Sequence, residues 1–324
     1  MTTFCFLKGP FVVGNVPSFN QFTKLPAASA AQVFSALPLN KKAALARTSK
    51  FYYGLFSQHI HAAKCLMLVA HGDQDAAAQM LTLNPKLLLE PTNVTDYSGR
   101  TFKKITAYEY AYWAKDTHMC RMLEAHMDEE TKASMLERIN KMERDGLTYE
   151  QRGVVVEHSK HFDFTPLITA LTLYKDNYDD WSTTRDSDAM NAAWMNVGLK
   201  QRDLPVHVVN EYFHPHRSFN PKPTFNEETL PRNLTFYNYI TGVTSTLFPL
   251  VVSDSAGLGV NFALIRSFTN SARAVSGEWW SAPNHTHSVC DLEAVMHLDK
   301  VRTAELSQSL KNLQPATGPE HSYS

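Results

Sequence analysis

Three observations predict a mainly α-helical protein with a few short strands. Apolar residues between 107 and 123 recur at helical intervals, in two short runs separated by a polar pair. Two similar helical halves occupy residues 62–85, broken at Gly72 and Asp73 and ended by Pro85. An amphipathic pattern over residues 291–313 predicts a final helix. Helices this short cannot bury their apolar faces alone, so we expect them to stack against one another.

The stretch from Val94 to Met127 carries the clearest boundary signals. Gly99 can supply the positive φ of a tight turn. Thr106 stands where a helix N-cap would be, and Glu109 follows three residues later, which is the spacing of a capping box. Residues 115–116 then interrupt the apolar stripe. We therefore predict a loop, a helix, a polar turn and a second helix.

Three segments resemble degenerate ankyrin-type units. These are residues 62–85, the central unit, and residues 164–171, where FTPLITAL places a proline in the first helical turn. The central unit keeps the family's Asp-x-x-Gly-x-Thr opening at Asp96, Gly99 and Thr101. The resemblance implies a helical stack over residues 61–175 that binds a partner through its loops. The candidate binding residues are then Tyr97, Arg100, Lys103 and Lys104. The alternatives are helical hairpins without a true repeat, and a merely solvated loop.

Residues 25–60 resemble an F-box. The segment opens with Leu25 and Pro26, and Val33 and Leu37 recur on a first predicted helix. Ala27 stands where that family has an acidic residue. The resemblance implies small helices that dock on the adaptor of a cullin-type ubiquitin ligase, with Leu25 and Pro26 at the interface. The alternative is a helical cap on the end of the stack. Residues 1–24 are predicted to form an aromatic-rich arm that packs on the body.

Composition argues against several classes of function. There are 31 Lys plus Arg against 32 Asp plus Glu, so no charge excess attracts nucleic acid or an anionic membrane. The four cysteines lie far apart, which indicates neither a disulfide framework nor a zinc site and favours a reducing compartment. No apolar stretch is long and uninterrupted enough to predict a membrane span. We expect no cofactor and no metal.

Residues 176–324 are predicted to form an α-rich region with a few short strands. The strands are expected at 234–242 and 247–254, where β-branched and aromatic residues gather between turn formers. Residues 146–164 are interpreted as a polar connector after a helix that Asp128 caps and Gly146 ends.

Residues 201–218 form the densest polar stretch of the chain. Pro205 can open a helix on which His207 and Glu211 lie one turn apart on the same face. Such a pair can share a proton, bind a metal or hold the helix against a neighbour. The pair is also similar to the His-x-x-x-Glu motif of bacterial toxins that transfer AMP and depend on host actin. That resemblance would make His207 and Glu211 catalytic, and Arg202 and Arg217 are candidates to bind a ligand beside them.

The chain contains no phosphate-binding loop, nucleophile elbow or zinc-protease motif. As a whole it resembles effectors that intracellular bacterial pathogens deliver into eukaryotic host cells. The resemblance implies a protein-interaction module in host cytosol, whose partners are host proteins such as the cullin-ligase adaptor. The alternative is the AMP-transferring enzyme centred on His207 and Glu211.

Overall fold

The computed structural model describes residues 37–232, 235–238, 243–246, 263–267, 273–275 and 283–315. The chain forms two compact units, residues 1–60 and residues 61–324, and each is considered by itself. The first unit contains α2 (Leu39–Ala46) and the beginning of α3 (Lys50–Ala70). Leu25, Pro26 and the predicted arm lie outside the described residues. The F-box resemblance therefore stays a prediction.

The second unit begins with short helices at the predicted positions. The end of α3 is followed by α4 (Gln74–Leu83), η2 (Pro85–Leu89), α5 (Ala107–Trp113), α6 (Thr117–Glu124) and α7 (Glu129–Asp145). Asp73 caps α4, and Thr106 and Glu109 form the predicted capping box of α5. Asp116 caps α6 after the predicted polar turn, and Asp128 caps α7, which ends at Gly146 with φ 72°. The helix–turn–helix of the central stretch is confirmed.

A four-stranded antiparallel sheet was not predicted. It has the order β1-β2-β3-β4, with β1 (Thr92–Thr95), β2 (Arg100–Ile105), β3 (Leu147–Gln151) and β4 (Val154–Ser159). The interpretation of residues 146–164 as a polar connector is wrong, because most of them form the β3–β4 hairpin. Arg152 and Gly153, with φ 50° and 78°, make its two-residue turn. In β2 and β3, Phe102 faces Tyr149 across the register, and this face joins the core.

The rest of the unit is mainly helical. It comprises α8 (Thr165–Thr184), α9 (Ser187–Gln201), α10 (Val206–Tyr212) and α11 (His285–Asn312), and the predicted domain boundary at residue 175 lies within α8. A second sheet has the order β6-β5-β8-β7, with β5 (Thr235–Asn238), β6 (Val243–Thr246), β7 (Ala263–Ile265) and β8 (Arg273–Val275). β5 falls within the strand predicted at 234–242, whereas the strand predicted at 247–254 lies outside the described residues.

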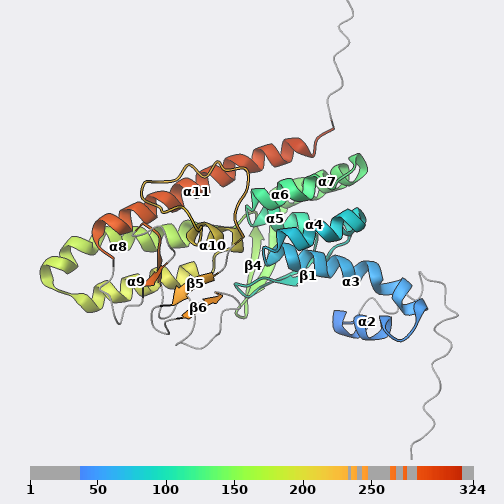
Figure 1. Cartoon of the computed structure of the whole chain (residues 1–324), viewed down its shortest axis with the longest axis horizontal. Helices are drawn as coiled ribbons and strands as arrows, with labels where there is room; N and C mark the ends of the chain where they lie inside the picture. Colours follow the sequence, from blue (N-terminus) through green and yellow to red (C-terminus); the bar gives the residue numbers. More distant parts are fainter. Residues whose placement is uncertain are drawn as a thin grey trace, which may run out of the picture. The chain divides into compact units, whose positions relative to one another are not determined.

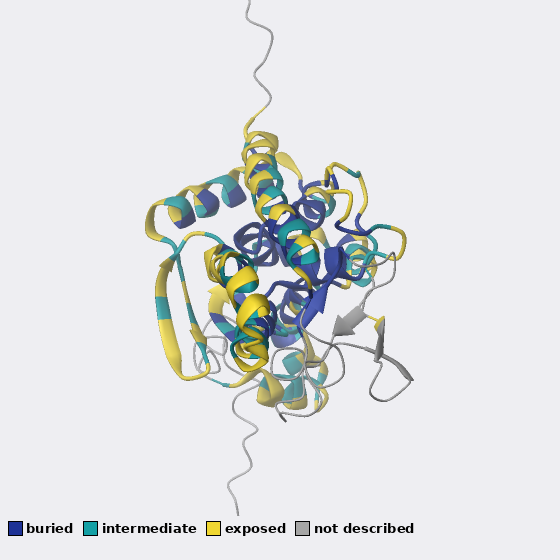
Figure 2. Cartoon of the chain, turned by 90° about the vertical axis from the view of Figure 1, so that its left-hand side faces the viewer, coloured by how far each residue is buried: buried dark blue, intermediate teal, exposed yellow. Residues whose placement is uncertain are grey.

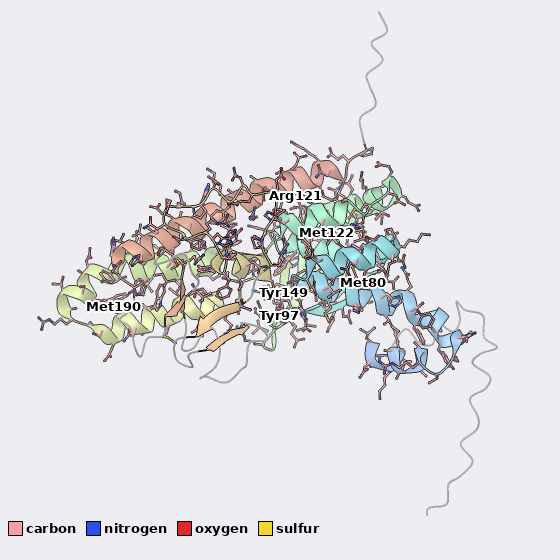
Figure 3. All side chains as sticks on the ribbon, viewed as in Figure 1. Met80, Tyr97, Arg121, Met122, Tyr149 and Met190 are labelled. Atoms are coloured by element: carbon pink, nitrogen blue, oxygen red, sulfur yellow. The ribbon has the colours of Figure 1, made fainter. Side chains whose placement is uncertain are left out.

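Helix α11 packs against both an early helix of this unit, α6, and a later one, α8. It lies along α8 and, nearer its C-terminal end, beside α6 (Figure 1). Buried residues gather where the helices meet, and exposed residues line the outer faces (Figure 2). Partly buried side chains pack against the core, among them Met80, Tyr97, Met122, Tyr149 and Met190 (Figure 3). The predicted fold class, mainly α with a few short strands, is confirmed. Within the described residues, none of the helices has the length and apolarity needed to cross a bilayer.

Candidate functional site

Helix α10 places the predicted His207–Glu211 pair inside the protein. The helix follows Pro205, as predicted, and every one of its residues is buried. Its N-terminal end packs on the α3–α4 turn, where an added Cβ at Gly72 would lie 2.5 Å from Val206 Cγ1. His207 is 1% exposed and Glu211 is 0% exposed. The pair therefore belongs to the interior of the unit.

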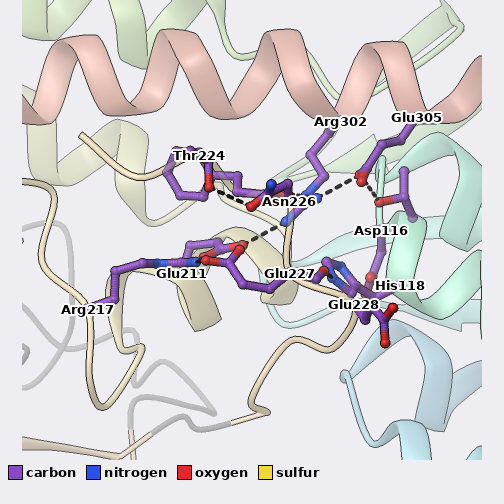
Figure 4. Close-up of polar contacts among 12 residues, drawn as sticks. Asp116, His118, Glu211, Arg217, Thr224, Asn226, Glu227, Glu228, Arg302 and Glu305 are labelled. Atoms are coloured by element: carbon purple, nitrogen blue, oxygen red, sulfur yellow. Dashed lines mark hydrogen bonds and ion pairs between the residues drawn. The ribbon is translucent and has the colours of Figure 1, made fainter. Parts of the chain in front are cut away.

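Glu211 lies at the centre of a buried ion-pair network (Figure 4). Its Oε1 accepts a hydrogen bond from Arg302 Nη2 at 2.8 Å, and its Oε2 is bound by Arg217 Nη2. Arg302 is also fully buried and donates to Glu305 at 2.6 Å and to the Phe225 carbonyl oxygen at 3.1 Å. The network ties α10 to α11 and to the loop at 214–232.

The network continues from α11 to α6. Thr117 Oγ1 donates to Glu305 Oε2 at 2.5 Å, and Arg121 Nη1 lies 3.6 Å from Glu305 Oε1. The same Glu305 oxygen that Thr117 contacts also accepts the hydrogen bond from Arg302. Burial opposes ionisation of Glu305, but the bond from Thr117 and the charge of Arg302 lower its pKa below the usual value. Glu305 therefore stays ionised and joins α6 to α11.

His207 lies beside a second buried ion pair. Asp116, the cap of α6, accepts two hydrogen bonds from Arg232, at 2.7 and 2.9 Å. Burial opposes ionisation of Asp116, but the charge of Arg232 outweighs it and holds the pKa of the carboxyl well below its usual range. Burial lowers the pKa of His207 to about 3, although Asp116 acts in the opposite direction. Burial also lowers the pKa of His118 to about 4. Both imidazoles are therefore neutral at neutral pH.

These geometries favour a structural role for His207 and Glu211. A general acid or base must reach a substrate proton, at hydrogen-bond distance or through one water molecule. Glu211 is buried and both of its oxygens are bound by guanidinium groups. A carboxylate held in this way fixes three chain segments together. The hypothesis of AMP transfer is left without a supporting geometric observation in the described residues.

Two of the candidate binding residues of the β1–β2 hairpin are not free surface groups. The prediction that Arg100 is an exposed loop residue is wrong, because it is 3% exposed. It pairs with Asp96 at 3.3 Å and donates to the Asp203 carbonyl oxygen at 2.5 Å. Its guanidinium also lies 5.2–5.7 Å from the ring centroids of Trp113, Tyr149 and Phe162. Tyr97 is partly buried and stacks on His71, with centroids 3.9 Å apart.

The two candidate arginines next to α10 lie in different places and have different partners. Arg217 joins the network by binding Glu211 and Glu227, and it lies 5.0 Å from the Phe225 ring centroid. Arg202 instead caps the C-terminus of α9, and its Nε lies 3.9 Å from Asp203 Oδ1. Arg152 at the tip of the β3–β4 hairpin also binds Asp203. The two arginines therefore do not share a ligand site.

Lys103 and Lys104 are exposed and line a surface groove of about 360 Å³. The groove is lined by residues of β2, β3 and β4 and by α7, which contributes Arg138 and Lys141. Glu109 lies 3.5 Å from Arg138, so this arginine is partly neutralised. The remaining lining residues are Thr101, Ile105, Met142, Gly146, Leu147, Thr148, Tyr149, Glu150 and Val155. This groove, called the basic groove below, is exposed to solvent, unlike the buried Glu211 network.

Sequence reasoning missed Arg302 in the Glu211 network, Asp116 and Arg232 in the second ion pair, and Arg138 and Lys141 in the groove. Arg302 stands in a helical pattern in which a charged residue is normally solvated. Arg138 and Lys141 are three residues apart, a spacing that does place both on one helix face. Nothing in the sequence pattern predicts that this face of α7 lies beside β2.

The fold and these two sites define a mainly helical protein with a buried ion-pair network and a basic surface groove. Residues 166–313 match the family model described as the CBUA0006 C-terminal domain. A protein of Coxiella burnetii, described as "Uncharacterized protein CBUA0006", is 39% identical over 275 residues, which cover 79% of this chain and 77% of that protein. The chain therefore belongs to the CBUA0006 family. No solved structure matches it.

Proposed function

We propose that the chain is a bacterial protein delivered into the host cytosol, where it acts as a protein-interaction module. The observation that carries the proposal is the basic groove. Lys103, Lys104 and Lys141 line it, and no carboxylate of the described residues forms an ion pair with any of them. Strand β2 and helix α7 together present these charges at the surface.

Two further observations support the host-cell setting. The chain resembles delivered effectors, and its relative comes from Coxiella burnetii, a species with secreted effectors. The F-box resemblance of residues 25–60 supports a second contact, in which Leu25 and Pro26 dock on the adaptor of a cullin-type ligase. The chain would then bring a partner, held in the groove, to the ubiquitin machinery.

Delivery is tested with a reporter. The full chain is fused to a calmodulin-dependent adenylate cyclase, which makes cyclic AMP only inside a eukaryotic cell, and expressed in Coxiella burnetii. We expect host cyclic AMP to rise during infection, and not with a secretion-defective strain. Equal signals from the two strains, or none from either, would contradict delivery.

Recruitment of the ligase is tested by binding the full chain to the purified adaptor. We expect Leu25→Ala/Pro26→Ala to abolish this binding and Lys103→Glu/Lys104→Glu to preserve it, because the two contacts are made by different units. If the unchanged chain does not bind the adaptor, the F-box part of the proposal fails while the groove part stands.

A further inference from the structure

The backbone of β2 places two consecutive lysines in the same groove. In a regular strand, residues 103 and 104 would point to opposite faces of the sheet. Both line the basic groove, and the residues that flank them, Phe102 and Ile105, are buried. The irregularity that allows this lies at Lys104, whose φ is 55°. The β1–β2 register also shifts opposite it, between Thr92 and Val94.

This conformation is stabilised by the neighbouring strand. Asn93 Oδ1 accepts a hydrogen bond from the Lys104 backbone N–H at 3.0 Å. A non-glycine residue at positive φ costs about 1–2 kcal/mol, and such a cost persists only where the surroundings hold it. The result is that both lysines line the groove to which α7 contributes Lys141.

The charge and the floor of the groove point to a peptide. The charged residues of the lining are four cations and two carboxylates, and Glu109 partly neutralises Arg138. The lining also contains apolar residues, of which Ile105 and Met142 are buried and Val155 is exposed. Glu150 also lines the groove, so an anionic ligand must keep its charges near the lysines and away from this carboxylate. An extended segment can place its carboxylates at the lysines and an apolar side chain between them.

We infer that the basic groove binds an acidic peptide segment of a partner protein, with Lys103, Lys104 and Lys141 contacting its carboxylates. The inference rests on the proposed function and names the chemistry of the partner. It does not depend on delivery, since binding is measured with the purified chain alone.

The probe is an array of random dodecapeptides in which half of the positions are Asp or Glu and the others are apolar. Two matched arrays carry Ser or Lys at the same positions. We expect the full chain to bind a subset of the acidic peptides and neither of the others. The Kd of the best peptides, measured by fluorescence anisotropy, should rise with salt because the contacts are exposed ion pairs.

Lys103→Glu/Lys104→Glu should weaken this binding by about tenfold or more, which corresponds to about 1.4 kcal/mol per factor of ten. Lys300→Glu/Lys311→Glu, an equal charge change at exposed positions of α11, is the matched control and should leave the Kd within about twofold. Lys141→Glu is a second groove variant that leaves β2 unchanged. An equal loss in the control, or no acidic peptide bound, would overturn the inference. Equal competition by inorganic phosphate would also overturn it, in favour of a general anion site.

Discussion

At the scale of single residues, the contrast between Glu211 and Lys104 decides where function is expected. Glu211 is fully buried, and a guanidinium group binds each of its two carboxylate oxygens. Lys104 is exposed, at a backbone angle that a lysine adopts only at a cost. A buried ion pair holds a fold together, whereas an exposed charge held by a costly backbone is typical of binding sites.

Arg302→Met should lower the free energy of unfolding by about 3–5 kcal/mol, because it removes a buried cation and leaves the buried Glu211 without one of its two guanidinium partners. Urea unfolding measures the loss, and Lys300→Met, at an exposed position of the same helix, is the control. The double variant Arg302→Met/Glu211→Gln should lose less free energy of unfolding than the sum of the losses of the two single variants. If Glu211→Gln leaves stability nearly unchanged, the structural role of Glu211 is refuted and the catalytic hypothesis gains support.

The buried histidines should make the protein sensitive to acid. In the unfolded chain a histidine has a pKa near 6.5, whereas burial lowers the pKa of His207 to about 3 and that of His118 to about 4 in the folded protein. Below pH 6.5 the unfolded state therefore binds more protons, and stability falls as the pH falls. At pH 5 each histidine contributes about 2 kcal/mol to this loss.

His207→Gln should reduce the loss of stability between pH 7 and pH 5, measured by urea unfolding at both values, and His216→Gln at an exposed position should not. Burial raises the pKa of Asp291 to about 7, so this group has the opposite pH dependence. Each variant is therefore compared with the parent chain at the same pH. A His207→Gln variant with the parent's pH dependence would show that this imidazole does not stay neutral in the fold.

At the scale of elements, the packing of α10 on the α3–α4 turn can be measured with two glycines. Gly72 and Gly99 have φ of 78° and 79°, so alanine brings the same backbone strain at both. A Cβ meets nothing within 4 Å at Gly99 but lies 2.5 Å from Val206 Cγ1 at Gly72. Gly72→Ala should therefore cost about 1–3 kcal/mol more than Gly99→Ala. Adding Val206→Ala to the Gly72→Ala variant should recover part of this difference. Equal losses of stability in Gly72→Ala and Gly99→Ala would contradict the packing of α10 on this turn.

The local signals in the sequence predicted the helices well. Thr106 with Glu109, Asp128 with Gly146, and Pro205 all lie at helix ends, because capping and φ preferences act within one turn. The first sheet was missed because β2 reads RTFKKI, with two adjacent lysines, and β4 faces solvent over much of its length. Neither strand shows a simple apolar–polar alternation.

The candidate site was predictable only in part. Lys103 and Lys104 could be proposed from their place after the Gly99 turn, and the structure does put both in the groove. The groove residues on α7 could not be predicted, because only tertiary packing brings residues 138 and 141 into the same groove as residue 103. Arg100 was misjudged for the same reason: the rings of Trp113 in α5, Tyr149 in β3 and Phe162 in the β4–α8 connection cover it.

At the scale of the whole molecule, the buried network and the basic groove lie in the same unit but have different roles. Residues 61–324 are held together by α11 and the Glu211 network, and the groove lies between α7 and the sheet of the same unit. The chain's near-zero net charge gives no general attraction for polyanions. Selective binding of acidic segments must therefore come from the local arrangement of the three lysines.

Photo-crosslinking in host cells tests the central claim most directly. The chain carries p-benzoylphenylalanine in place of Lys104 in one form and in place of Lys300 in the other, and covalent adducts are identified after irradiation. We expect a defined host protein to be crosslinked from position 104 and not from position 300, with the adduct suppressed by adding Lys141→Glu. The same adducts from both positions, or an adduct at 104 that Lys141→Glu leaves unchanged, would contradict a partner bound in the basic groove.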